Sequence, residues 1–170
     1  NTQRSHIIVE HNDDSGSVDE QAYIKKLTSD VRVVSIVHTS PVTGMTVDLE
    51  KITKEVRNVT PDCIIIVDGI QHSSHGAIDV QKYDIDGYVV SPYKMFSRHG
   101  YGVAWASDRL CTLNKEQLTG GPFQNWELGT RDAGSYATFS DVVDYLDWLG
   151  SNFTESENTC LLYTSDAADD

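Results

Sequence analysis

The sequence lacks any apolar run that approaches the ~20 residues of a membrane-spanning helix. Basic residues are few: 13 Lys and Arg stand against 26 Asp and Glu, so the net charge is −13. That balance argues against binding nucleic acid or an anionic membrane through bulk charge. Three widely spaced cysteines form neither a disulfide framework nor a zinc pattern. With no secretory signal visible, these absences predict a cytoplasmic protein.

The chain has 170 residues, enough for one domain with a core, and it is organised around the stretch from Cys63 to Lys94. Two short apolar runs in this stretch, 63–67 and 87–90, are rich in β-branched residues, which is typical of buried parallel strands. Polar side chains follow each run. Because ligands of open α/β sheets bind beyond the carboxyl ends of the strands, we expect one shared edge to carry Asp68, Gln71, Ser91 and Lys94.

The rest of the chain alternates strand and helix patterns, so the predicted fold class is α/β, a mainly parallel (mixed) sheet flanked by helices. Capping residues and amphipathic spacing define the helices, and β-branched residues define the strands. No internal repeat is evident. The predicted strands are 6–10, 31–37, 63–67, 87–90 and 102–106, the predicted helices are 20–27, 47–56 and 134–149, and 111–122 is a loop or frayed helix.

The polar set at the shared edge suits pyridoxal 5′-phosphate. This cofactor needs a lysine amine to form a Schiff base, and a carboxylate that keeps its pyridine nitrogen protonated as an electron sink. Val67–Gln71 reads Val-Asp-Gly-Ile-Gln and Ser91–Lys94 reads Ser-Pro-Tyr-Lys. The pair resembles the Val-Asp-Gly-Ala-Gln and Ser-Gly-His-Lys motifs of the class V aminotransferases, the family that includes the cysteine desulfurases.

The resemblance covers about residues 6–150 and implies that residues 1–150 are part of the large domain of a fold-type-I pyridoxal-phosphate enzyme. It also implies that strand 102–106 is antiparallel, that the substrate is a small amino acid, and that the full-length protein is a homodimer. A C-terminal element near Trp126–Thr130 resembles the family's Phe-Glu-x-Gly-Thr segment.

Each residue of the paired motif takes a role from the resemblance. Lys94 is the Schiff-base lysine and the catalytic residue, and Asp68 holds the pyridine nitrogen. Gln71 donates to the phenolic oxygen of the ring, and Ser91 binds the phosphate. Tyr93 stands where many desulfurases have histidine, and its phenol could still donate to phosphate. Taken without the family, each is a polar residue after a strand, or a surface lysine.

Several positions depart from the family pattern or allow more than one interpretation. Pro41 stands where the family has an asparagine near the cofactor. His72 and His75 form a His-x-x-His pattern beside Asp68, which we interpret as solvated loop histidines rather than as a metal site. Cys63 is expected to be inert core packing, and neither it nor Cys111 lies where desulfurases carry their sulfur-accepting cysteine.

The predicted function is that of a pyridoxal-phosphate enzyme that acts on an amino acid, cysteine desulfurase-like or an aminotransferase. Two alternatives stay open: a nonfunctional fragment, and a non-catalytic α/β binding module that lacks the complete cofactor site. Residues 151–159 are expected to be a frayed C-terminal end. The tail 160–170 resembles a translated sequencing-library adapter, so we exclude it from the fold.

Overall fold

A computed structural model describes residues 5–116, 118–119, 126, 128–129 and 132–153. The predicted tail 160–170, the frayed end from residue 154 onward, and parts of the segments 111–122 and 126–130 lie outside the described residues. Among the described helices, none combines the length and the apolar character that crossing a membrane requires.

A four-stranded mixed sheet forms the centre of the fold, in the order β1-β2-β3-β4. The first three strands are parallel and the last is antiparallel, as the resemblance implied. The strand bounds are β1 Val33–Val37, β2 Ile64–Asp68, β3 Gly87–Val90 and β4 Val103–Ala106. The four predicted strands from residue 31 onward are therefore confirmed, with ends that differ from the prediction by two residues at most.

The predicted strand at 6–10 is wrong: these residues belong to no strand, and Ile7 and Ile8 are exposed. Val9 does pack against the core as a partly buried residue. A short apolar run can be an extended segment as readily as a strand, because its periodicity does not identify a hydrogen-bonding partner.

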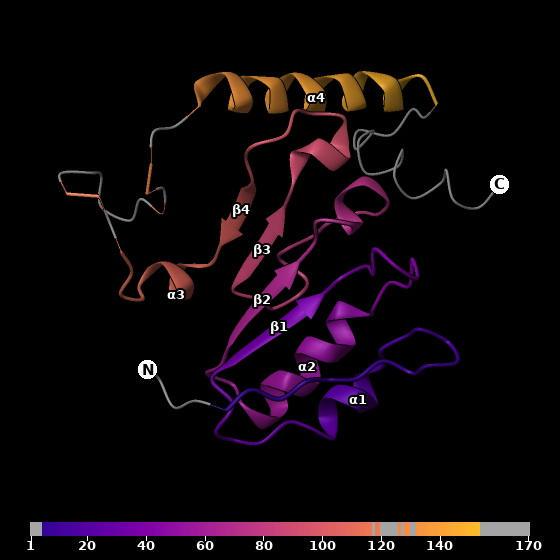
Figure 1. Ribbon diagram of the computed structural model, residues 1–170, viewed down its shortest axis with the longest axis vertical. Coiled ribbons are helices and arrows are strands. Elements are labelled where there is room, and N and C mark those ends of the chain that lie inside the picture. The colour runs from indigo at the N-terminus through magenta and orange to yellow at the C-terminus, as the bar shows by residue number, and fades with distance from the viewer. Residues whose placement is uncertain (1–4, 117, 120–125, 127, 130–131, 154–170) are drawn as a thin grey trace.

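Helices α1 and α2 cover one face of the sheet, and the long helix α4 does not lie on that face (Figure 1). Helix α1 begins after Asp19, and α2 begins after Asp48, each with a carboxylate that accepts a backbone N–H as an N-cap. Helix α4 runs across the molecule beyond the ends toward which β1, β2 and β3 point. The helix bounds are α1 Glu20–Ile24, α2 Leu49–Val59, α3 Asp108–Cys111 and α4 Ala133–Ser151, and the short 3₁₀ turns are η1 His72–Ser74 and η2 Pro92–Met95.

The core forms between α1, α2 and the sheet face that they cover. Alternate strand residues point into it, as a strand's period of two requires. Helix α2 adds Leu49, Ile52 and Val56 from one side, as the amphipathic spacing predicted. The central residues of the cluster are Tyr23, Val34, Ile36, Cys63, Ile65, Val67, Ile85 and Tyr88. Burial raises the pKa of the Cys63 thiol, and this agrees with its predicted role as inert packing.

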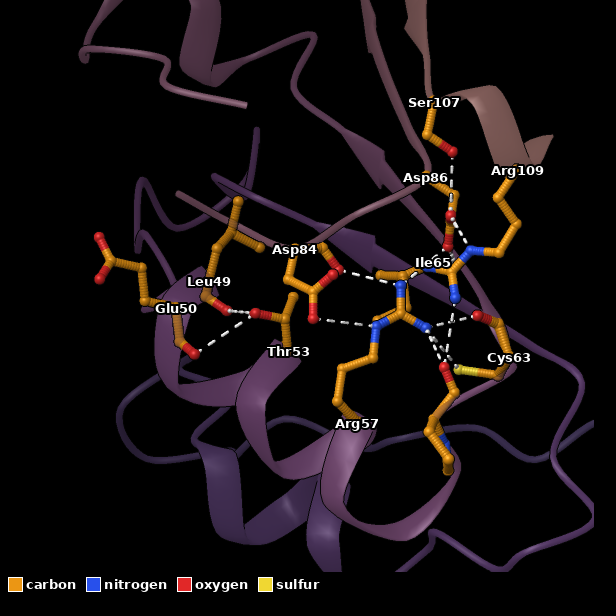
Figure 2. Close-up of polar contacts among 11 residues, drawn as sticks. Leu49, Glu50, Thr53, Arg57, Cys63, Ile65, Asp84, Asp86, Ser107 and Arg109 are labelled. Carbon is orange, nitrogen blue, oxygen red and sulfur yellow. Dashed lines mark hydrogen bonds and ion pairs between the residues drawn. The ribbon is translucent and has the colours of Figure 1, made fainter. Parts of the chain in front are cut away.

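A buried carboxylate joins the strands at the amino end of the sheet (Figure 2). Asp86 precedes β3 and is 0% exposed. It accepts hydrogen bonds from Arg57 Nη2 at 3.0 Å, Arg109 Nε at 2.7 Å, Ser107 Oγ at 3.0 Å and Ile65 N at 2.8 Å. Burial alone would raise the pKa of Asp86, but these four bonds outweigh it and lower the pKa.

The Asp86 cluster ties together parts of the chain that are distant in sequence. Arg57 comes from α2, Ile65 from β2, and Arg109 from α3 after β4. Arg57 is 12% exposed and also donates to the carbonyl oxygens of Cys63 at 2.6 Å and Asp84 at 3.0 Å. This cluster fixes the amino end of the sheet, opposite the edge where the predicted functional residues lie.

Candidate functional site

The carboxyl edge of β2 and β3 brings together the residues that the sequence predicted for one site. Asp68 is the last residue of β2 and lies in register with Val37 of β1 and Val89 of β3. Lys94 lies in η2, which begins one residue after Ser91 and follows β3. Because β2 and β3 are parallel, both residues belong to the same edge of the sheet.

One hydrogen bond connects the two loops at this edge. Lys94 Nζ donates to Gln71 Oε1 at 2.7 Å. Gln71 precedes η1, and the η1 and η2 turns contact each other. Gln71 Nε2 also lies 3.2 Å from His75 Nε2. Lys94 and Gln71 are half-buried, so a ligand in solvent can still contact both side chains.

Asp68 is held by the turn that follows it. Its Oδ1 accepts the backbone N–H of Ile70 at 3.0 Å, and the side chain is half-buried. Strand alternation directs it away from Val67, which is fully buried under the helices. Gly69 allows this arrangement, because a Cβ at that position would meet Tyr88 Cε1 at 2.0 Å.

Ser91 and Tyr93 flank the lysine. Ser91 is half-buried, and its carbonyl oxygen accepts the Lys94 N–H at 3.0 Å. Tyr93 is 40% exposed and stacks on His99 with ring centroids 4.4 Å apart. The Lys94 ammonium lies 6.0 Å from the centre of the Tyr93 ring. Arg98, which follows the same turn, forms an ion pair with Asp132, with Nη2 3.6 Å from Oδ2.

Three buried rings, those of His38, His72 and Tyr88, pack together beside this edge. We call them the buried aromatic group, and the sequence did not reveal it. His38 follows β1 directly, and its Nδ1 lies 2.8 Å from the Tyr88 hydroxyl. Its ring stacks on His72 with centroids 3.5 Å apart. Burial lowers the pKa of His38 to about 4, with a further contribution from His72. Burial, Tyr83 and Asp68 raise the pKa of Tyr88, so both side chains stay neutral near pH 7.

The two loop histidines have different environments. His75 is exposed, as predicted, but His72 is only 8% exposed, so the prediction that both are solvated is wrong for His72. Its Nδ1 lies 2.9 Å from Thr39 Oγ1 and its Nε2 lies 3.2 Å from the Ala77 carbonyl oxygen. Both ring nitrogens are thus engaged within the protein. The described part of the chain holds no cluster of three or more metal-ligating side chains.

The loop after β1 also approaches this edge. Thr39 forms an isolated bridge with Thr46, and their hydroxyls are 2.8 Å apart. Pro41 is exposed at the tip of the loop. The sequence could have indicated His38 and Thr39, because they follow a strand as Asp68 and Ser91 do. Tyr88 gave no such signal, because an aromatic residue inside a strand is ordinary core.

The donor set at this edge matches the predicted cofactor in its chemistry. A primary amine, a primary amide and a carboxylate lie on adjacent loops, and a hydroxyl precedes the lysine. These are the groups that can bond a carbonyl carbon, a phenolic oxygen, a protonated ring nitrogen and a phosphate. The roles of Asp68, Gln71, Ser91, Tyr93 and Lys94 stay predictions.

Comparison with known proteins identifies relatives of this chain. A family model described as "Aminotransferase class-V" matches residues 1–159. A probable cysteine desulfurase of Mycoplasma genitalium is 31% identical over 100 residues, which are 59% of this chain and 24% of that protein. A probable cysteine desulfurase of Xylella fastidiosa is 25% identical over 163 residues, covering 87% of this chain and 39% of that protein.

Solved structures share the fold. The cysteine desulfurase CsdA from Escherichia coli aligns with a TM-score of 0.68 and 24% identity over 81% of this chain and 38% of that one. The apo cysteine desulfurase from Thermococcus onnurineus aligns with a TM-score of 0.69 and 21% identity over 86% of this chain and 40% of that one. The chain therefore spans between about a quarter and two fifths of the length of these relatives.

Proposed function

We propose, because the chain belongs to the class-V aminotransferase family, that its Lys94 edge is the cofactor-binding part of an enzyme that acts on a small amino acid. Class V aminotransferases and cysteine desulfurases depend on pyridoxal 5′-phosphate. The observation that carries the proposal is the 2.7 Å contact between Lys94 Nζ and Gln71 Oε1, on the edge where Asp68 ends β2.

In this proposal each side chain contributes one interaction. Lys94 would hold the cofactor through its amine, and Asp68 would face its protonated pyridine nitrogen. Gln71 would donate to the phenolic oxygen, while Ser91 and Tyr93 would donate to the phosphate. When bound, the cofactor supplies an electron sink that weakens bonds at the Cα of an attached amino acid. Protein groups orient it and set its charge.

The buried aromatic group would keep this edge rigid without taking part in proton transfer. His38 is 4% exposed and bonded to Tyr88, and Tyr88 fills the space beside Gly69. Because both side chains are neutral, neither places a competing cation beside Asp68. This arrangement supports a role for Asp68 as a partner of a cation.

The names of the relatives suggest which amino acid is the substrate. The relatives described above are named as cysteine desulfurases, which favours cysteine as the substrate over the amino acids of an aminotransferase. The same likeness leads us to propose a homodimer and a cytoplasmic location for a full-length protein of the relatives' size. Neither Cys63, which is buried, nor the partly buried Cys111 is proposed as a sulfur acceptor.

The Asp68→Asn variant tests the proposed role of the carboxylate. An asparagine keeps the shape of the side chain but no longer stabilises a protonated ring nitrogen. We therefore expect the full-length protein to retain some cofactor while its turnover falls by about a hundredfold or more. Absorbance of the bound cofactor and steady-state turnover are the two measurements. Unchanged turnover would remove Asp68 from the site.

A further inference from the structure

The Lys94–Gln71 contact belongs to a longer chain of hydrogen bonds that ends on His75. Gln71 uses Oε1 toward Lys94 Nζ at 2.7 Å and Nε2 toward His75 Nε2 at 3.2 Å. Lys94 lies in η2, whereas Gln71 and His75 flank η1 on either side. These hydrogen bonds therefore connect the two loops that carry the predicted cofactor residues.

Donor and acceptor chemistry fixes the direction of this chain. A lysine ammonium has three donors and no acceptor, so the Gln71 atom that faces it must be the amide oxygen. The amide nitrogen then faces His75, and an amide nitrogen only donates. His75 Nε2 must accept, which places the proton of its neutral ring on Nδ1. The amide of Gln71 is thus held by a donor on one side and an acceptor on the other.

We propose that His75 is a positioning residue that holds the Gln71 amide oxygen toward Lys94. Without an acceptor at residue 75, the amide is held only from the lysine side and samples other rotamers. The proposal rests on the proposed function in one respect: it gives the second N–H of Gln71 to the phenolic oxygen of the cofactor. The assigned His75 tautomer does not depend on any cofactor.

The neighbouring histidine does not replace His75. The two ring nitrogens of His72 are engaged with Thr39 Oγ1 and with the Ala77 carbonyl oxygen. His38 is stacked on His72 and bonded to Tyr88. In the loop from Gln71 to Ala77, His75 is the ring whose nitrogen faces the Gln71 amide.

Nitrogen-15 NMR of the 170-residue chain tests the proposal directly. At a pH where His75 is neutral, we expect His75 Nε2 to be unprotonated and to show scalar coupling to the Gln71 side-chain amide. His75→Leu should shift the Gln71 side-chain signals and the Lys94 ammonium signal. His75→Gln, whose carbonyl oxygen can accept the same hydrogen bond, should restore both toward their original positions. A proton on Nε2 in the neutral ring, or Gln71 and Lys94 signals unmoved by His75→Leu, overturns the proposal.

Cofactor capture by the full-length protein provides the second readout. One net hydrogen bond changes an equilibrium by about two- to tenfold. His75→Leu should therefore weaken capture of pyridoxal 5′-phosphate by about that factor, and His75→Gln should recover most of it. Equal capture by the original protein and His75→Leu contradicts the positioning role. Absence of capture in every protein contradicts the proposed function, while the NMR result still decides the tautomer.

Discussion

Asp86→Ala should destabilise the chain more than any other single substitution outside the large apolar core residues. The change leaves Arg57, Arg109, Ser107 and the Ile65 N–H without their shared acceptor. Arg57 is 12% exposed, so water replaces the lost carboxylate poorly. Breaking a buried ion pair by removing one partner costs about 3–5 kcal/mol. Urea unfolding followed by circular dichroism measures the loss.

The neighbouring Asp84 offers a matched control for this prediction. Its carboxylate also pairs with Arg57, at 3.3 Å, but the side chain is 68% exposed. Asparagine tolerates the positive φ of 47° at that position, so Asp84→Asn changes the charge with little strain. An exposed ion pair is worth about 1 kcal/mol or less. Equal unfolding midpoints for Asp86→Ala and Asp84→Asn would show that the cluster does not hold the sheet together.

Lys94→Ala in the full-length protein should abolish the absorption band that pyridoxal 5′-phosphate acquires when a protein lysine attaches to it. The amine is the atom that forms the bond, so no other group at the edge compensates. Lys94→Arg is the sharper variant, because it keeps a cation beside Gln71 and yet lacks a primary amine. We expect both variants to lack the band and to lose turnover by several orders of magnitude.

Two exposed lysines serve as controls for nonspecific attachment. Lys51 and Lys82 pair with Asp48 and Asp79 on the surface, with side chains 64% and 66% exposed. Lys51→Ala and Lys82→Ala should leave the band unchanged. A band that survives in Lys94→Arg, or that vanishes in Lys82→Ala, would move the attachment site away from Lys94.

The sequence predicted the carboxyl edge because the edge depends on local patterns. Short β-branched runs define β2 and β3, and the residues after them must lie at the ends of those strands. Chain order then places Asp68 and Lys94 on the same edge, as the structure has them. The hydrogen bond between Gln71 and Lys94 connects residues that the sequence had selected for one ligand.

The parts that the sequence did not predict depend on contacts between distant residues. The Asp86 carboxylate meets Arg57 and Arg109 from other elements, and only the folded sheet brings them together. An acid between Ile85 and Gly87 at the start of a buried strand is the signal that could have pointed to a buried pair.

The stack of His38 on His72 is a second contact of this kind. It joins the loop after β1 to the loop after β2, so no pattern within either loop predicts it. The predicted strand at 6–10 failed for a related reason, because a strand exists only where another strand pairs with it. Ile7 and Ile8 gave a local apolar signal, but they remain exposed.

Peptide mapping after chemical reduction tests the central claim most directly. The full-length protein is incubated with pyridoxal 5′-phosphate, the Schiff base is reduced with borohydride, and the digested peptides are analysed by mass spectrometry. The account predicts the reduced cofactor on the peptide that contains Lys94, and its absence there in the Lys94→Arg protein. Label spread over surface lysines such as Lys51 and Lys82, with Lys94 unmodified, would contradict it.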